Sequence, residues 1–302
     1  MFEIFRSLRL SDCNERAFML YAVGIASAIA RDGREFILLV DVDDTPAAGE
    51  HLHLYEQERL VRPPPPPPPP KLHPHALKGS IAYALVLYFV AYAVSNGLWR
   101  LDAFDVGELN ARLVQQGQWW RVFTALTLHL DLLHLMSNIV FGMWFGYLAS
   151  RLIGVGNAWL LVVLGAGFAN WVEGYFGPPG HLSVGASTAV FTALGLLSGY
   201  SWRTRLAYPQ RWALRWAPLV AGAVLLSWTG TGGESIDQPG TGGAGMTVDV
   251  LAHALGFFVG LGAGLAVALQ AVSRVLDRVP QWLAGLLALV PLALAWIRGL
   301  TS

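Results

Sequence analysis

Apolar residues gather in long stretches over most of the chain beyond residue 78. A helix needs about 20 consecutive apolar residues to cross the hydrocarbon core of a bilayer. The candidate stretches are 79–99, 132–150, 157–176, 185–201, 212–229, 249–272 and 281–299. We therefore expect an all-α polytopic membrane protein with six membrane-spanning helices and a seventh, C-terminal helix. Pro291 and Arg298 in the last stretch also fit a shorter helix at the membrane interface.

The part of the chain before these stretches is more polar, and its apolar patterns extend over shorter segments. Residues 14–30 carry apolar side chains at helical spacing, and a turn signal follows at Asp32 and Gly33. The next run, FILLV at 36–40, is typical of a strand, and residues 45–57 fit a second helix. We expect a small α+β module that is too short to bury a large core of its own.

Eight consecutive prolines separate this module from the apolar stretches. They occupy residues 63–70 and predict a polyproline II rod of about 25 Å, at ~3.1 Å per residue. We interpret the rod as a stiff spacer, although such a run also fits an SH3-type ligand. The sequence thus predicts a soluble module over 1–62, a polyproline linker over 63–78 and a membrane domain over 79–302.

Composition supports the assignment to a membrane. Hydrophobic residues make up 54% of the chain, charged residues only 13%, and there are 12 tryptophans, which is expected of a chain immersed in lipid. The formal net charge of zero argues against nucleic-acid binding through bulk electrostatics. The single cysteine, Cys13, excludes an internal disulfide.

Basic residues between the stretches predict the orientation in the membrane. If the spans alternate in direction, most of the connecting lysines and arginines fall on one side, which the positive-inside rule identifies as cytoplasmic. These residues are Lys71, Lys78, Arg151, Arg203, Arg205, Arg211, Arg215, Arg274 and Arg278. We therefore expect the amino module in the cytoplasm and the polar segments 100–121, 177–184 and 230–248 on the outer side.

Strongly polar side chains stand at the start of three apolar stretches. The second stretch carries His134 and Asn138, the fourth carries Ser187, and the sixth carries His253. Such groups are costly inside a bilayer and mark functional sites. Because the even-numbered spans all begin on the outer side, we expect the four side chains at one depth.

This combination is typical of nucleophilic catalysis. A serine hydroxyl needs a general base within hydrogen-bond reach, and His253 is the best candidate to activate Ser187. His134 and Asn138 are four residues apart, so they share one helical face and can donate hydrogen bonds to an oxyanion. We interpret Asp249 as a helix N-cap rather than a third catalytic group.

Small residues predict close packing of the fourth and sixth spans. Gly256 and Gly260 follow His253 on its own helical face, and Gly195 and Gly199 repeat the spacing on the fourth span. Glycines at such positions let two helices approach closely, which would bring Ser187 to His253.

Four motifs follow one another between about Ile81 and Ala271. They are GQWWRVFTALTLH at 117–129, HLMSN at 134–138, GASTAVF at 185–191 and AHALGFFVG at 252–260. In order and spacing they resemble the rhomboid intramembrane serine proteases, including the Trp120-Arg121 pair of the first outer loop. Some bacterial relatives carry a further histidine where this chain has Ala125.

The resemblance implies a fold, a site and an activity. It implies a six-helix core with a Ser187–His253 dyad, an oxyanion site at His134 and Asn138, and no metal or other cofactor. Gly185 would support the site, and Phe191 occupies the position of an aromatic residue that packs against the catalytic histidine. The implied partners are the lipid bilayer and single-span membrane proteins, which the family cleaves near the outer membrane face. The amino module is similar to the cytoplasmic domain of bacterial relatives, which predicts a bacterial inner membrane.

Two other functions remain open on sequence alone. An inactive relative could bind membrane clients without cutting them. A small transporter could use the buried histidines and asparagine as a proton or solute path, and internal repeat symmetry would favour it. The sequence shows no such repeat.

Overall fold

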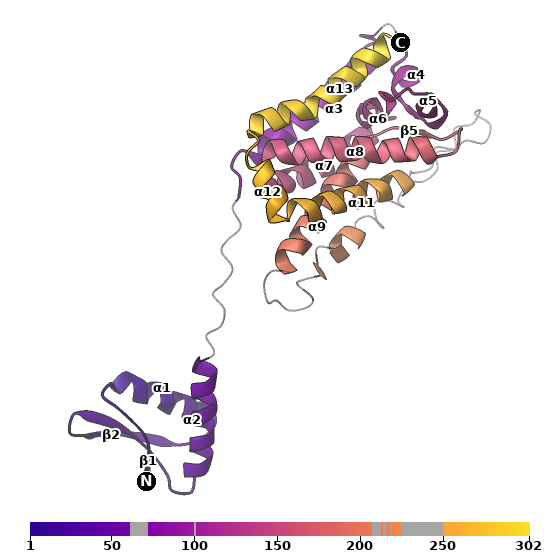
Figure 1. Cartoon of the computed structure of the whole chain (residues 1–302). Helices are drawn as coiled ribbons and strands as arrows, with labels where there is room; N and C mark the ends of the chain where they lie inside the picture. Colours follow the sequence, from indigo (N-terminus) through magenta and orange to yellow (C-terminus); the bar gives the residue numbers. More distant parts are fainter. Residues whose placement is uncertain (61–71, 100, 207–212, 214–215, 218, 225–249) are drawn as a thin grey trace. The chain divides into compact units, whose positions relative to one another are not determined.

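The computed structural model describes the whole chain apart from residues 61–71, 100, 207–212, 214–215, 218 and 225–249. The chain forms two compact units, Met1–Pro68 and Pro69–Ser302 (Figure 1). The predicted polyproline rod, the predicted outer loop at 230–248 and Asp249 lie outside the described residues.

The first unit is a small α+β module, as predicted. Its elements are β1 (Phe2–Ser7), α1 (Leu10–Ala22), β2 (Ser27–Asp32), β3 (Glu35–Val40) and α2 (Thr45–Leu60). The three strands form an antiparallel sheet in the order β1-β3-β2, with the two helices packed against it. The core consists of Leu20, Ile25, Leu38, Val40, Ala48 and Leu52.

The helix predicted over 14–30 is wrong in its second half. Helix α1 ends at Ala22, and Gly24 follows with a φ of +83°, a conformation that glycine adopts without steric cost. Residues 27–32 then form β2, which pairs with β3 from Ser27 opposite Val40 to Asp32 opposite Glu35. The spacing of the apolar residues in this segment fits either a helix or a strand. Pairing with β3 therefore determines that it forms a strand.

The second unit is a bundle of long helices with short elements between them. Its elements are α3 (Ala76–Ser95), α4 (Ala103–Gly107), β4 (Leu109–Asn110), α5 (Ala111–Gln115), α6 (Arg121–Thr124), η1 (Ala125–Thr127), α7 (Leu132–Ile153), α8 (Val155–Phe176), β5 (Leu182–Ser183), α9 (Ser187–Leu206), α11 (Val250–Val267), α12 (Gln270–Leu276) and α13 (Gln281–Leu300). Of the predicted span 212–229, residues 213, 216–217 and 219–224 are helical, and the others lie outside the described residues.

Five of the described helices are long and apolar enough to cross a membrane. They are α3, α7, α8, α11 and α13. Helix α9 is more polar, but most of its side chains are buried against other helices, so it needs little lipid-facing apolar surface. The chain is therefore an integral multi-pass membrane protein, with the C-terminal helix present as predicted.

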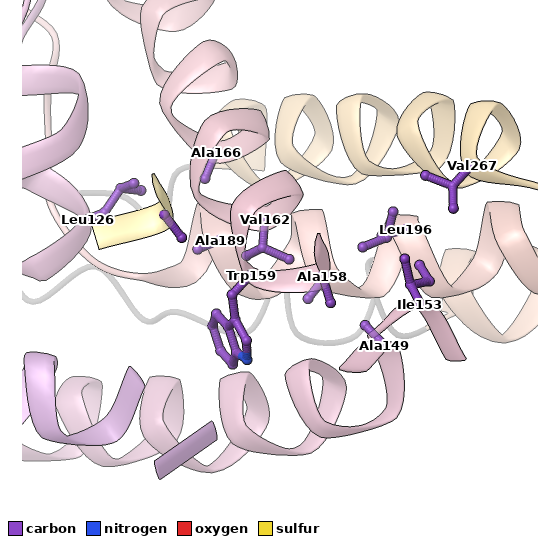
Figure 2. Close-up of a cluster of buried hydrophobic side chains, with 12 residues drawn as sticks. Leu126, Ala149, Ile153, Ala158, Trp159, Val162, Ala166, Ala189, Leu196 and Val267 are labelled. Carbon is purple, nitrogen blue, oxygen red and sulfur yellow. The ribbon is translucent and has the colours of Figure 1, made fainter. Parts of the chain in front are cut away.

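Helix α8 lies at the centre of the bundle, in contact with α7, α9, α11 and α13. Figure 2 shows the apolar cluster around it, in which Trp159 and Val162 lie among side chains of neighbouring helices. The Trp159 ring stacks on Tyr83 with centroids 4.9 Å apart. A side chain at Gly79 or Gly146 would overlap this ring, so small residues on α3 and α7 make room for it.

Candidate active site

His134 and Asn138 are positioned by the first turns of α7. The Oδ1 atom of Asp131 accepts a hydrogen bond from the backbone N–H of His134 at 2.8 Å and thereby caps the helix. Because His134 and Asn138 are one turn apart, both side chains lie on one face of α7. His134 is half-buried and Asn138 is buried.

The turn that precedes α9 lies directly on this face. Gly185 has a φ of +127°, and a Cβ atom placed there would lie 2.6 Å from Nε2 of His134 and 3.6 Å from Nδ2 of Asn138. Helix α9 begins two residues after Gly185, at Ser187, which is half-buried. Residue 185 thus lies, with the turn before Ser187, beside the imidazole and the amide, and its missing side chain leaves that space open.

A histidine without an assigned role in the sequence analysis also contacts this turn. Nε2 of His129 accepts a hydrogen bond from the backbone N–H of Ala186 at 3.4 Å, and Nδ1 lies 3.3 Å from the carbonyl oxygen of Thr127. Burial, with a smaller effect of His134, lowers the pKa of His129 to about 4. The ring is therefore neutral at pH 7, as one accepting and one donating nitrogen require.

His253 approaches the start of α9 from α11. Its ring is buried and packs on the ring of Phe191, with centroids 4.4 Å apart. Phe191 lies one helical turn after Ser187, so both point from the same face of α9. The contact therefore brings His253 to the turn of α9 that carries Ser187.

The two helices touch along their backbones beyond this point. A Cβ atom at Gly256 would lie 2.6 Å from the carbonyl oxygen of Thr188, and one at Gly260 would overlap that of Thr192. On the facing helix, side chains at Gly195 and Gly199 would overlap carbonyl oxygens of α11. Small residues on both sides therefore set the distance between α9 and α11.

Trp120 and Arg121 shape the segment before α7 rather than the polar cluster. The buried Arg121 guanidinium donates to the carbonyl oxygens of Asp105 and Glu108 at 2.6 and 2.8 Å, and to Oε1 of Gln118. The Trp120 indole donates to the carbonyl oxygen of Val106 at 3.1 Å. These part-buried bonds tie Trp120 and Arg121 to backbone carbonyl groups in and after α4, and so fix the segment that leads to α7.

The described residues bring together a hydroxyl, three imidazoles and an amide from α7, α9, α11 and the loop before α7. Among them, no group of three His, Cys, Asp or Glu side chains is arranged to hold a metal ion. A hydroxyl, an imidazole and N–H donors are the kinds of group that acyl transfer uses as nucleophile, base and oxyanion donors.

Comparison with known proteins identifies the family to which the chain is similar. A family model described as "Rhomboid domain" matches residues 116–270. The chain is 36% identical over 114 residues to "Rhomboid protease GluP" of Bacillus subtilis, covering 37% of this chain and 22% of that protein. It is 28% identical over 181 residues to "Rhomboid-like protease 1" of Toxoplasma gondii, covering 56% and 61%. It is 29% identical over 144 residues to "Rhomboid protease GlpG" of Serratia proteamaculans, covering 48% and 46%.

The matched region covers less than two thirds of each of these relatives. The residues that the family model matches include every residue of the polar cluster described above, from His129 to His253. Because the family model covers more than half of the chain, this protein belongs to the rhomboid family, an intramembrane protease family.

Proposed function

We propose that this protein is a serine endopeptidase that cleaves single-span membrane proteins within the bilayer, near its outer face. Ser187 is the nucleophile and His253 the general base. The observation that carries the proposal is the convergence on Ser187 from two sides. Phe191 holds His253 against one side of the helix start, and Gly185 brings the other side to His134 and Asn138.

The dyad performs acyl transfer in two steps. The Ser187 Oγ attacks the carbonyl carbon of the scissile bond while His253 takes the hydroxyl proton. His253 then gives that proton to the leaving nitrogen, and the acyl group stays on Ser187 as an ester. Water, deprotonated by His253, attacks the ester and releases the second product. The Phe191 ring orients the imidazole throughout, a task that a carboxylate performs in triads.

His134 and Asn138 stabilise the oxyanion that forms at each attack. The Asn138 amide is a donor through Nδ2, and His134 donates through Nε2 in the tautomer that carries its proton there. Both atoms face the space beside Gly185, next to the backbone N–H groups at the start of α9. N–H groups fixed in this way stabilise developing charge without reorganisation.

The location of the site restricts the substrate. Peptide bonds of a membrane helix are hydrogen-bonded to one another, so a substrate must unwind locally before its carbonyl reaches Ser187. Glycine or proline near the cut lowers the cost of unwinding. We place the amino module in the cytoplasm of a bacterium and the site in the outer half of the inner membrane, on the distribution of basic residues.

A fluorophosphonate probe tests the proposal without knowledge of the natural substrate. The probe should label the purified protein, and Ser187→Ala should remove the label. Ser183→Ala is the matched control, because Ser183 lies four residues earlier in β5, paired with Leu109 of β4, and should keep full labelling. Labelling that survives in Ser187→Ala, or that is lost in Ser183→Ala instead, would contradict the assignment.

The space beside Gly185 gives a second prediction. Gly185→Ala should lower kcat by on the order of 100-fold, since its methyl group would occupy the position of the oxyanion. KM for a cleavable membrane substrate should change little, because the methyl group excludes the oxyanion more than the bound ground state.

Gly180→Ala is the matched control for this substitution. Gly180 lies in the same connection between α8 and α9, and a Cβ atom there meets nothing within 4 Å. Its kcat should stay at the wild-type value. A Gly185→Ala enzyme with normal kcat would remove His134 and Asn138 from the oxyanion site.

A further inference from the structure

Helix α13 lies outside the residues that match the family model, yet it contacts the segment that leads to the active site. The Trp296 side chain points from α13 into this segment, and its exposed fraction is 9%. Its ring lies against the ring of Trp99, with centroids 4.4 Å apart. Its Nε1–H donates a hydrogen bond to Oγ1 of Thr127 at 3.0 Å.

Further contacts hold α13 along its length. At its first residue, Oε1 of Gln281 accepts a hydrogen bond from the backbone N–H of Gly156 at 2.9 Å, at the start of α8. In its last turn, the Arg298 guanidinium lies 4.9 Å from the centroid of the Trp120 ring. Gly299 leaves room for the same ring, since a Cβ atom there would lie 3.1 Å from it. Trp296 is thus fixed between two anchored ends.

Thr127 connects the Trp296 side chain to the backbone at η1. Its hydroxyl donates to the carbonyl oxygen of Thr124 at 2.8 Å while it accepts from Trp296, so both functions of the hydroxyl are used. Thr127 is 2% exposed, so both bonds of its hydroxyl are buried. Its own carbonyl oxygen faces Nδ1 of His129 at 3.3 Å.

Two hydrogen bonds connect η1 and its neighbour His129 to the loop of the nucleophile. The carbonyl oxygen of Ala125 accepts from the backbone N–H of Gly185 at 2.9 Å. Nε2 of His129 accepts from the backbone N–H of Ala186 at 3.4 Å. Ala186 directly precedes Ser187, so the orientation of its peptide sets the position of the serine Cα atom.

We propose that Trp296 is a positioning residue for Ser187 and acts through the hydrogen-bonded path Trp296–Thr127–His129–Ala186. The path joins an added C-terminal helix to the nucleophile without touching the substrate. A displacement of Ser187 by a fraction of an ångström lowers the rate of attack, because reaction requires close alignment of the two reacting atoms. This inference rests on the proposed function, in which Ser187 is the nucleophile.

The test distinguishes the effect of the indole N–H hydrogen bond from the effect of the size of the ring. Trp296→Phe keeps an aromatic ring and removes the donor, and Thr127→Val removes the acceptor. Each should lower kcat and the rate of fluorophosphonate labelling about tenfold with KM near the wild-type value, and each should lower Tm modestly because it leaves a buried polar group without its partner. Thr127→Ser, which keeps the hydroxyl, should retain the wild-type rate. Trp282→Phe on the exposed side of the same helix is the control and should have no effect.

The double variant Trp296→Phe/Thr127→Val decides whether the two residues act through one bond. Its kcat should be no lower than that of either single variant, because the first substitution has already broken the hydrogen bond that the second would break. Multiplied losses would overturn the path. If Trp296→Phe lowers Tm strongly, the comparison of Thr127→Val with Thr127→Ser carries the test.

A second measurement does not depend on protease activity. In a Cys13→Ala background, Ser187→Cys introduces a single thiol, whose rate of alkylation reports the position and environment of residue 187. Adding Trp296→Phe should change that rate severalfold, and adding Trp282→Phe should not. An unchanged alkylation rate would overturn the inference. A changed alkylation rate, together with a Ser187 parent protein that neither cleaves nor takes the probe, would support the path and reject the proposed function.

Discussion

Ser187→Ala and His253→Ala should each abolish cleavage of a model single-span substrate, with a loss in kcat of at least ~10⁴-fold. Each substitution removes one of the two groups that acyl transfer requires, the nucleophile or the base, and donors to the oxyanion alone supply little of the rate. The measurement is the cleavage rate in detergent and in reconstituted vesicles.

Folding should survive both substitutions. Ser187 is half-buried at the first residue of α9, and alanine is at least as good a helix former. His253→Ala removes the ring that packs on Phe191, so we expect a lower Tm for this variant than for Ser187→Ala. Substantial cleavage by either folded variant would reject the dyad and direct attention to Ser183.

Gly260→Val should disrupt both the stability and the activity of the protein. A Cβ atom at Gly260 overlaps the carbonyl oxygen of Thr192, and backbone atoms can move away only if α9 and α11 separate. Overpacking of this kind costs about 3 kcal/mol of unfolding free energy. Because the same separation moves His253 away from Ser187, cleavage and Tm should fall together.

Gly262→Val is the matched control on the same helix. Gly262 is exposed, and a Cβ atom there meets nothing within 4 Å, so valine at this position points away from α9. Its Tm and cleavage rate should equal those of the wild type. If Gly260→Val behaved like Gly262→Val, the contact between α9 and α11 would not control the geometry of the dyad.

Much of the helical core was predictable because its signals are local. A run of apolar residues long enough to cross a bilayer marks α7, α8 and α13 without reference to any other part of the chain. The spacing of His134 and Asn138 also determines that they share a face of α7, since four residues make about one helical turn. The module's second helix and its strand at 36–40 follow from the same kind of short-range pattern.

Within residues 1–32, local sequence patterns did not predict all of the secondary structure correctly. The apolar residues over 14–30 are compatible with a helix throughout, but residues 27–32 form a strand that pairs with β3. Strand β1, which the sequence did not predict, pairs with the other edge of β3. Hydrogen bonds between strands depend on the partner strand, so the periodicity of one segment does not determine them.

Within the site, the sequence by itself determined which polar residues are present. It also determined that they lie near the starts of their helices. The tertiary structure decided which of them meet: His253 with Phe191, Gly185 with His134, and Ala186 with His129. It also decided that Trp296 contacts Thr127, from which it is separated by 169 positions in the chain. Helix periodicity extends over a few turns, whereas these contacts arise only when packing of α13, α11 and α9 brings distant segments together.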